Sequence, residues 1–353
     1  MRTVSIVLLA GAFAFCSQDA RGENLPSFGV RDCAWHATHI VEVTQGMERK
    51  GVLTVRDSWK GDLRKGDVLT FPELGNFATE EQRKIFNREK ALPNRVTHVS
   101  SLRMVVFLCK NDKGRNDPKS LPIWGGAGWG RDVKASVAWL DGDEVFAYVQ
   151  IANPGPQVLL PLEVTEKQFK AKVMEIVRAK ETFQQAVQVK ELGKRALCLR
   201  PLVLLDIPAC ERDSIEALGQ CGEQGLPVIQ SLLNQNLREN IAPELIRTMG
   251  KIGGEKAGKE LASYLKDEFA FWKQRGPQLK SDWWQDQRMD NKERRYLQNR
   301  SAKFNAILNA LAEAKNTKCQ PLVREVDDFV KEHPHVGGES ATRWCQVILA
   351  AKD

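Results

Sequence analysis

The sequence is poor in the residues that carry conventional acid–base chemistry. It has five histidines and three tyrosines among 353 residues. It also has no nucleophile elbow, no pair of catalytic carboxylates, no dinucleotide fingerprint and no zinc-protease pattern. Glycine and proline follow no period, which excludes a collagen-like chain. The sequence therefore assigns no catalytic residue, no cofactor and no metal site, and it favours a protein that is not an enzyme.

Long hydrophobic runs are absent except at the start of the chain, where the pattern is typical of a secretory signal. Arg2 provides a positive charge, Val4–Phe15 is apolar or small, and Ala20 and Gly22 are small residues of the kind that a signal peptidase requires. This run is shorter than the about 20 residues that a membrane-spanning helix needs. We expect a signal peptide at residues 1–22, with cleavage after Ala20 as the alternative, and a secreted or periplasmic protein without a membrane span.

Cysteines are too sparse for a disulfide scaffold. Of the eight in the chain, Cys16 would leave with the signal, and an odd number would remain. At least one thiol therefore lacks a partner within the chain. We consider two disulfides: Cys33 with Cys109, which would join the start of the N-terminal module to its central strand, and Cys319 with Cys345, on neighbouring predicted helices.

From residue 31 to about 161, short apolar runs alternate with turn signals, which predicts strands without regular helices between them. Asp141-Gly142 is a strong hairpin signal, because this pair tolerates positive φ angles. The most apolar run, Leu102–Cys109, should be central in the sheet. Short strands in this number suggest a small barrel or sandwich. The predicted strands are Thr38–Val43, Val52–Trp59, Val68–Phe71, Leu102–Cys109, Val137–Leu140, Glu144–Val149 and Val158–Leu162.

Part of this region resembles a known class of exported modules. Val55–Leu69 contains a strand that ends at Lys-Gly-Asp, followed by a Gly-Asp turn into the next strand, and Arg103–Cys109 follows as a central hydrophobic strand. The pattern resembles the OB-like barrel of the netrin and tissue-inhibitor-of-metalloproteinase type over about residues 31–110. The resemblance implies a barrel but no activity. In those inhibitors the amino-terminal cysteine chelates the protease zinc, and this chain has no cysteine at its predicted mature terminus.

A second resemblance concerns the end of the N-terminal module. Ser136–Gly142 and Gln150–Pro156 are similar to a stretch of exported bacterial proteins of unassigned function, which also continue into helical repeats. The resemblance supports an N-terminal module over residues 23–162 and helical repeats over residues 163–353. It implies no activity.

The hydrophobic period changes to that of helices at Thr165, and an internal repeat follows. Ile215–Gly222 aligns with Ile246–Gly253, which lies 31 residues later, and Leu308–Ala314 begins a weaker third copy. Gly219 and Gly250 are expected to let neighbouring helices approach, while the glycines at 222 and 253 are expected to end the first helix of each pair. This pattern resembles HEAT repeats. We expect an α-helical HEAT-like solenoid, with an irregular helical bundle as the alternative.

Residues 269–300 interrupt the repeat and combine aromatic with basic residues. Eight basic and four acidic residues lie in this segment. Aromatic rings beside cations can stack on sugars or bases while they hold anionic groups. The alternative, which we favour, is a long helical hairpin whose aromatic rings fill the core and whose charges are solvated. The segment nevertheless holds the best candidates for partner binding: Trp272, Trp283, Trp284, Arg294 and Arg295.

Two other groups of residues have a structural and a functional interpretation. Cys33, His36 and His39 recur at a spacing of three and could form a soft metal site, but a packed helix that enters the barrel is favoured. Trp124–Gly130 is a glycine-rich aromatic segment, which could hold a ligand or simply be a loop. It lacks the Lys-Ser/Thr pair and the helix of a phosphate-binding loop.

Together these features predict a multi-domain protein with a small N-terminal OB-like β-barrel and a C-terminal helical solenoid. The net charge falls from +7 to about +6 after removal of residues 1–22, so the protein can attract anionic polymers. The predicted function is that of an exported, non-catalytic interaction protein that binds a protein or an anionic cell-envelope polymer, without nucleic acid. The alternative is a hydrolase or an enzyme inhibitor that acts through the barrel.

Overall fold

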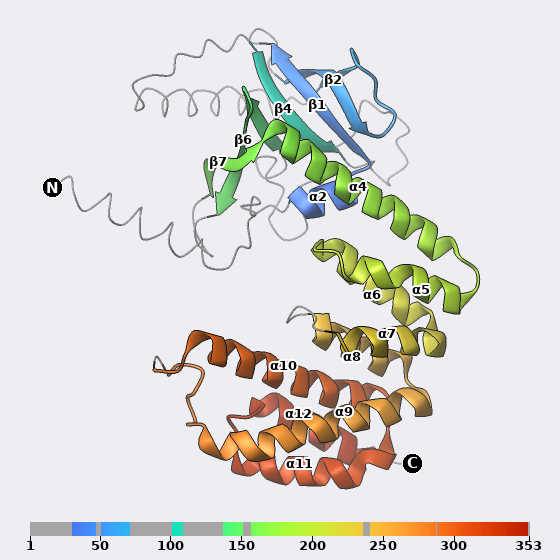
Figure 1. Ribbon diagram of the computed structural model, residues 1–353, viewed down its shortest axis with the longest axis vertical. Coiled ribbons are helices and arrows are strands. Elements are labelled where there is room, and N and C mark those ends of the chain that lie inside the picture. Colours follow the sequence, from blue (N-terminus) through green and yellow to red (C-terminus); the bar gives the residue numbers. More distant parts are fainter. Residues whose placement is uncertain are drawn as a thin grey trace, which may run out of the picture. The chain divides into compact units, whose positions relative to one another are not determined.

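The computed structural model describes residues 30–46, 51–70, 101–108, 137–150, 157–235, 241–286 and 288–351. It divides the chain into two compact units, Met1–Lys180 and Glu181–Asp353. The described strands lie in the first unit, together with the helical residues 30–36 and 166–180, and the other described helices lie in the second (Figure 1). The predicted order of a β-rich half followed by a helical half is confirmed, and the structure is of the mixed α and β class.

The strands of the first unit form one antiparallel sheet in the order β3-β2-β1-β4-β5-β6-β7. All seven predicted strands are present, and β4 is central, as its apolar sequence predicts. Gly142 joins β5 to β6 with a φ of 56°, which explains the Asp-Gly pair at this turn. The strands are β1 (His39–Gly46), β2 (Val52–Lys60), β3 (Val68–Thr70), β4 (Ser101–Leu108), β5 (Val137–Asp141), β6 (Glu144–Gln150) and β7 (Gln157–Thr165).

Within the described residues this sheet is open, and β3 and β7 are its edge strands. The sequence predicted a closed barrel of the OB type. The described strand pairs include none between the two edges. The structure therefore supports an antiparallel sheet, and closure of this sheet into a barrel stays a prediction. The predicted loop Trp124–Gly130 lies outside the described residues.

Both faces of the central strands are buried. One face carries an apolar cluster of β1, β2, β4 and β5 that includes Val41, Met104, Val106 and Trp139. Residues of this face and of the opposite face alternate along each strand, because successive side chains of a strand point to opposite sides of the sheet. Phe107, which lies on that opposite face, is also fully buried. A strand that is buried on both faces has a continuous apolar sequence, which is the pattern of β4.

Helix α4 (Glu166–Gln188) follows β7 directly and crosses the sheet (Figure 1). Its start is a capping box: the Gln168 backbone N–H donates to Thr165 Oγ1 at 3.2 Å, and the Thr165 backbone N–H donates to Gln168 Oε1 at 2.8 Å. Phe169 is buried and lies 6.2 Å from the ring of Trp59 in β2, measured between centroids. The predicted change of period at Thr165 therefore coincides with the junction of strand and helix.

The short helix α2 (Val30–His36) contacts the same long helix. Trp35 of α2 is fully buried, and the ammonium group of Lys180 in α4 lies 4.2 Å from the centre of its ring. A lysine over an indole face is an attractive cation–π contact. This contact holds α2 against the part of α4 that belongs to the first unit.

The second unit consists of helices joined by short connections. Within the described residues, none of its helices, and none of those in the first unit, is long and apolar enough to cross a bilayer. The helices are α5 (Leu192–Val203), α6 (Pro208–Gln220), η3 (Gly222–Gly225), α7 (Leu226–Leu233), α8 (Ile241–Ile252), α9 (Gly254–Arg275), η4 (Gly276–Gln278), α10 (Asn291–Glu313), η5 (Thr317–Cys319), α11 (Gln320–Glu332) and α12 (Gly338–Ala350).

Helices α6, α8, α10 and α12 form a row in which each packs on the next. Small residues allow the close approach that the repeat predicts. A Cβ atom at Gly219 would lie 3.0 Å from Thr248 Cγ2, and one at Gly250 would lie 2.6 Å from Ala310 Cα. Gly222 and Gly253, which follow α6 and α8, have φ angles of 59° and 65°. The predicted roles of these four glycines are confirmed.

Candidate partner-binding surface

The predicted aromatic and basic segment, residues 269–300, comprises the end of α9, η4, a series of turns and the first turns of α10. The start of α10 is fixed by Asp290, whose side chain accepts hydrogen bonds from the backbone N–H groups of Lys292 and Glu293. Arg294 donates to the carbonyl oxygens of Asp286 and Met289. These contacts hold the turns against the first turn of α10.

Two of the predicted partner-binding tryptophans are buried. Trp272 of α9 is fully buried, and Trp283 is 3% exposed. The indole N–H of Trp283 donates to the backbone oxygen of His335 at 3.0 Å. Both rings therefore belong to the packing of the second unit, as the favoured alternative in the sequence predicts, and they cannot present a face to a partner.

Trp284 and Tyr296 differ from these rings because they are exposed, at 43% and 50% respectively. Trp284 lies edge-on to Trp283, with 6.1 Å between the ring centroids, so the buried ring supports the exposed one. Tyr296 lies one turn into α10. Trp283 and Trp284 are adjacent in the sequence, yet only Trp284 is exposed. The structure also adds Tyr296 to the candidates for partner binding.

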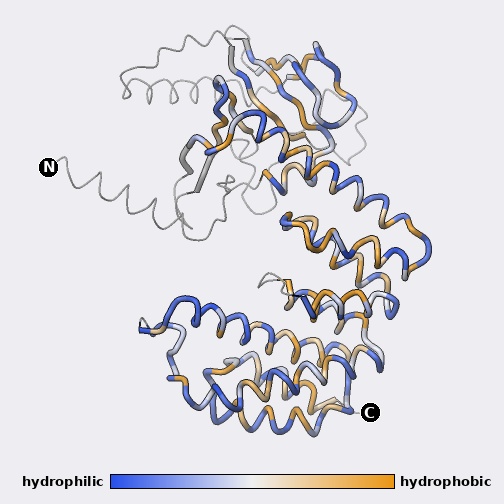
Figure 2. The backbone as a smooth tube through the Cα atoms, in the orientation of Figure 1, coloured by the Kyte–Doolittle hydropathy of each residue, from blue (hydrophilic) through white to orange (hydrophobic). Residues whose placement is uncertain are grey.

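Exposed cations lie on the same turns and on the first half of α10. The side chains of Arg288, Lys292 and Arg295 are exposed. Arg294, the other predicted arginine, is half-buried and holds the turns in place rather than facing solvent. Figure 2 shows that α10 is hydrophilic over its first half and becomes more hydrophobic over its second half. We call Trp284, Arg288, Lys292, Arg295 and Tyr296 the aromatic–basic surface.

Tyr296 is held by a stack with α9. The guanidinium carbon of Arg300 lies 3.9 Å from the centre of the Phe271 ring, and Arg300 Nη1 donates to Tyr296 Oη at 3.2 Å. Phe271 and Tyr296 meet edge to face, with 6.0 Å between centroids. A ring that is fixed before binding loses less conformational freedom when a partner arrives.

Glu268 of α9 contacts the same Arg300, and its role was not predicted from the sequence. It is 2% exposed, and its oxygens lie 2.9 Å from Arg300 Nε and 2.8 Å from Lys303 Nζ. Removal of one partner from a buried ion pair destabilises a protein, because it leaves a buried charge without compensation. In the sequence Glu268 looks like an ordinary surface position of α9, so only the contact with α10 identifies it.

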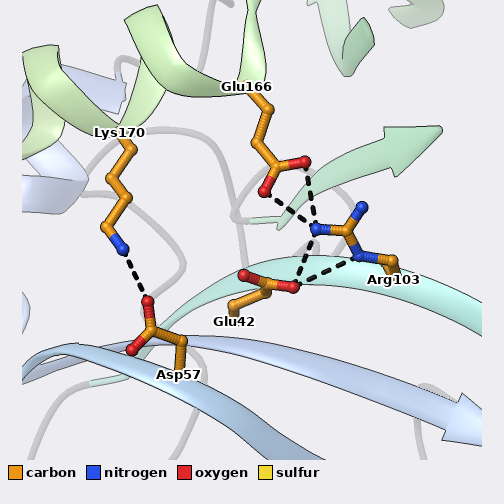
Figure 3. Close-up of polar contacts among 5 residues, drawn as sticks. All are labelled: Glu42, Asp57, Arg103, Glu166 and Lys170. Carbon is orange, nitrogen blue, oxygen red and sulfur yellow. Dashed lines mark hydrogen bonds and ion pairs between the residues drawn. The ribbon is translucent and has the colours of Figure 1, made fainter. Parts of the chain in front are cut away.

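The first unit contains a second polar network that sequence reasoning did not find. Arg103 of β4 bridges two carboxylates: its Nη2 lies 2.9 Å from Glu42 Oε1 of β1 and 2.8 Å from Glu166 Oε1 of α4 (Figure 3). Nearby, Lys170 Nζ of α4 lies 2.5 Å from Asp57 Oδ2 of β2. The network connects α4 to three strands.

The pKa values of two members reflect these contacts. The hydrogen bond and the charge of Lys170 hold the pKa of Asp57 below its ordinary value, against a smaller opposing effect of burial. Burial alone would lower the pKa of Arg103, but its hydrogen bonds to Glu42 and Glu166 raise it above the ordinary value. Both carboxylate contacts therefore favour the charged guanidinium.

The predicted cysteine and histidine cluster is not brought together as a metal site. Cys33 is buried and His36 exposed on α2, whereas His39 begins β1 and its Nε2 lies 2.6 Å from Asp62 Oδ1. A Cβ atom at Gly61 would lie 2.2 Å from the ring of His39, so only glycine fits over this ring. Across the residues that the structure describes, no group of three such side chains could hold a metal ion.

Three of the four cysteines considered for disulfides lie among the described residues. Cys33, Cys319 and Cys345 are buried, and Cys109 lies outside the described residues. Burial raises the pKa of Cys319 to about 11 and that of Cys345 to about 12. Both thiols are therefore protonated and poorly reactive at neutral pH. Pairing of Cys319 with Cys345, and of Cys33 with Cys109, stays a prediction.

The fold and the surface were compared with known proteins. No family model, no curated protein and no solved structure matches this chain.

Proposed function

We propose that this chain is an exported interaction protein that binds an anionic cell-envelope polymer through its aromatic–basic surface. The observation that carries the proposal is the exposure of Trp284 and Tyr296 among exposed cations. An exposed indole or phenol ring can stack on a flat sugar or apolar face, while the neighbouring guanidinium and ammonium groups attract negative charge. The proposal assigns binding, and no chemical reaction, to this surface.

The charge of residues 269–300, with eight basic and four acidic residues, supports a negatively charged partner over a neutral one. Several cations of the segment already meet carboxylates: Lys273 lies 3.1 Å from Glu325, and Lys280 lies 3.5 Å from Asp286. The side chains of Arg288, Lys292 and Arg295 are exposed. Exposed cations attract an anionic partner, and the attraction should fall with salt.

The proposal also covers the two modules of the chain. We propose that the row formed by α6, α8, α10 and α12 is part of a HEAT-like solenoid, and that the sheet is part of an OB-like module that serves as a second recognition element. Burial of the His39 ring under Gly61 supports a structural role for the His39–Asp62 contact, since an acid or base must reach its substrate. This observation favours binding over the alternative of a barrel-based hydrolase.

Binding can be tested with an envelope fraction and its isolated anionic polymers, at several salt concentrations. Replacement of Trp284 by alanine should weaken capture about tenfold without loss of folding, because the ring is exposed. The double variant Arg288→Ser with Lys292→Ser should weaken capture and reduce its dependence on salt. Trp283 is unsuitable for this test, because its ring is buried and its loss would disturb the packing.

The matched control is the double variant Lys256→Ser with Lys266→Ser, which removes the same charge from exposed positions of α9 outside the surface. It should capture the polymer as the unmodified chain does. Equal loss of capture in both double variants would mean that overall charge, rather than this surface, attracts the polymer. Capture of a protein by the same surface, with no binding of isolated polymer, would contradict the polymer proposal.

A further inference from the structure

The loop between α11 and α12, residues 333–337, is fixed by hydrogen bonds. Within the loop, the backbone N–H of Val336 donates to the backbone oxygen of His333 at 3.0 Å. The side-chain amide of Asn305 in α10 donates to the backbone oxygen of Gly337 at 3.1 Å. The loop is therefore anchored to the helix that carries most of the aromatic–basic surface.

His335, in the middle of this loop, joins it to the segment that precedes the exposed ring of Trp284. Its backbone oxygen accepts the indole N–H of Trp283 at 3.0 Å. Its ring nitrogen Nε2 lies 3.0 Å from the backbone oxygen of Gly276 in η4. Because a carbonyl oxygen can only accept, Nε2 carries the proton and donates. One residue therefore ties both η4 and the later turn at Trp283 to the loop.

Gly276 also packs closely against the same part of the chain. A Cβ atom at this position would lie 2.9 Å from Val336 Cγ2 and 3.0 Å from Phe329 Cζ. Val336 is fully buried. The backbone of η4 thus rests directly on these side chains, which keeps the oxygen of Gly276 within reach of His335.

The contacts of His335 reach the aromatic–basic surface through the two tryptophans. Trp283 is 3% exposed, and its ring supports Trp284 edge-on, with 6.1 Å between the centroids. Trp284 follows Trp283 directly in the chain, so the placement of one constrains the other. A ring that is held in one orientation loses less conformational freedom when it binds.

We propose that His335 is a positioning residue of the aromatic–basic surface. Its two hydrogen bonds fix η4 and Trp283, and through Trp283 they hold the Trp284 ring in the orientation that binds the anionic polymer. His335 does not itself contact the polymer. The effect on capture rests on the proposed function, whereas the effect on Trp284 can be measured without any partner.

The alternative is that the bonds of His335 only stabilise the fold, and Gln320 provides the matched comparison. Its side-chain amide also donates to backbone oxygens, those of Ile348 and Ala351, at 3.1 and 2.9 Å, and it joins the start of α11 to the end of α12. Loss of the side-chain hydrogen bonds of either residue should lower the urea midpoint. Only the loss at His335 should change the environment of Trp284.

The first measurement uses the free protein and a heteronuclear NMR spectrum, in which each indole N–H gives its own signal. The signals of Trp283 and Trp284 are assigned by their absence in the variants with phenylalanine at either position. His335→Ala should shift or broaden both signals, and Gln320→Ala should leave them unchanged. His335→Gln should restore them, because its amide can donate to Gly276 in place of the imidazole. Unchanged signals in His335→Ala would overturn the proposal.

The second measurement is capture of isolated anionic polymers at one salt concentration. His335→Ala should weaken capture about fivefold, which corresponds to the loss of one hydrogen bond and is less than the effect of Trp284→Ala. His335→Gln and Gln320→Ala should capture as the unmodified chain does. In a chain that already carries Trp284→Ala, the change His335→Ala should cause no further loss, because it acts through that ring.

The outcomes distinguish this inference from the proposed function. Equal losses of capture in His335→Ala and Gln320→Ala, or a further loss when His335→Ala is added to Trp284→Ala, would overturn the positioning role. Full capture by His335→Ala while Trp284→Ala loses capture would also overturn it, and would leave the proposed function intact. Equal capture by Trp284→Ala and the unmodified chain would contradict the proposed function, and the indole signals would then decide alone whether His335 places Trp284.

Discussion

At the scale of single residues, the contact of Glu268 with Arg300 and Lys303 gives a stability prediction. Replacement of Glu268 by alanine leaves Arg300 and Lys303 without the carboxylate that both contact. Since the cations are partly exposed, at 25% and 32%, they can regain some water. We expect a loss of about 2 kcal/mol in the free energy of unfolding, measured by urea denaturation.

The control for Glu268 is Glu255→Ala. Glu255 also has a lysine partner, Lys318, at 2.6 Å, but both side chains are largely exposed. Water and salt weaken such a pair, so its loss should leave the urea midpoint unchanged. Similar urea midpoints for the two variants would show that the buried contact at Glu268 stabilises the chain no more than the exposed pair at Glu255.

The contact between Asp57 and Lys170 predicts a dependence of stability on pH. The pKa of Asp57 is lowered in the folded chain, so its contribution is complete above the unfolded pKa and disappears as the pH falls through the folded pKa. Both side chains are partly exposed, and we expect about 0.5 kcal/mol at pH 7. Asp57→Asn should therefore lower the urea midpoint at pH 7, and this effect should shrink as the pH falls below the ordinary aspartate pKa of about 4.

The variant Lys170→Met removes the other half of this ion pair and should reproduce the pH dependence of Asp57→Asn. The double variant should be no less stable than either single variant at pH 7, because both changes remove the same interaction. A difference between Asp57→Asn and the unmodified chain that does not shrink as the pH falls through the acidic range would contradict the prediction.

Individual site residues were the part of the structure least accessible to sequence reasoning. Trp283 and Trp284 are adjacent and have the same composition signal, yet one is buried and the other exposed. The difference is made by the loop before α12, which supplies the backbone oxygen of His335 to Trp283. Glu268 and Arg103 likewise acquire their roles from segments far away in the chain. Such contacts leave no local periodicity to detect.

At the scale of elements, the approach of α8 to α10 is set by Gly250. A Cβ atom there would lie 2.6 Å from Ala310 Cα and 2.7 Å from Ala310 O. Both are backbone atoms, so rotation of a side chain cannot relieve the clash. Gly250→Ala should therefore destabilise the chain by about 2 kcal/mol, although alanine is the better helix former. Thermal or urea unfolding followed by circular dichroism measures this loss.

Gly193 is the matched control because it is also a glycine inside a helix. A Cβ atom there would meet only the end of the flexible Gln224 side chain, at 3.4 Å. Gly193→Ala should leave stability unchanged or raise it by up to about 1 kcal/mol. If the two variants respond alike, close helix packing does not explain the glycine at position 250.

Most elements could be predicted from the sequence, because their signals are local. The seven strands have apolar runs between turn residues, and Thr165 and Gln168 form a capping box that marks the start of α4. The glycines at positions 219 and 250, which lie 31 residues apart, are part of the pattern that predicts a repeat. Closure of the sheet into a barrel could not be tested in this way, because it depends on pairing between distant edge strands rather than on the pattern within each strand.

At the scale of the whole molecule, the two compact units predict that the helical unit folds alone. Its core residues, including Leu261, Leu265 and Phe304, pack among the helices of residues 181–353. A fragment of residues 181–353 should have the circular dichroism of a helical protein and a cooperative thermal transition. It should also retain capture by the aromatic–basic surface.

The same fragment with Leu261→Asp provides the comparison, since this leucine is fully buried in α9. A buried aspartate without a partner should abolish the cooperative transition. A fragment that shows no transition even without this change would mean that the helices depend on the first unit for their stability.

The meeting of α8 and α10 at Gly250 and Ala310 also restricts how this protein can change over evolution. One residue inserted within either helix would rotate the following part by about 100° and replace the glycine by a bulkier neighbour at the point of contact. The turns between η4 and α10 are outside this contact, and they carry Trp284 and Arg288. Descendants of this chain can therefore vary the exposed positions of those turns, such as Trp284 and Arg288, while buried Trp283 and the packed helices stay unchanged.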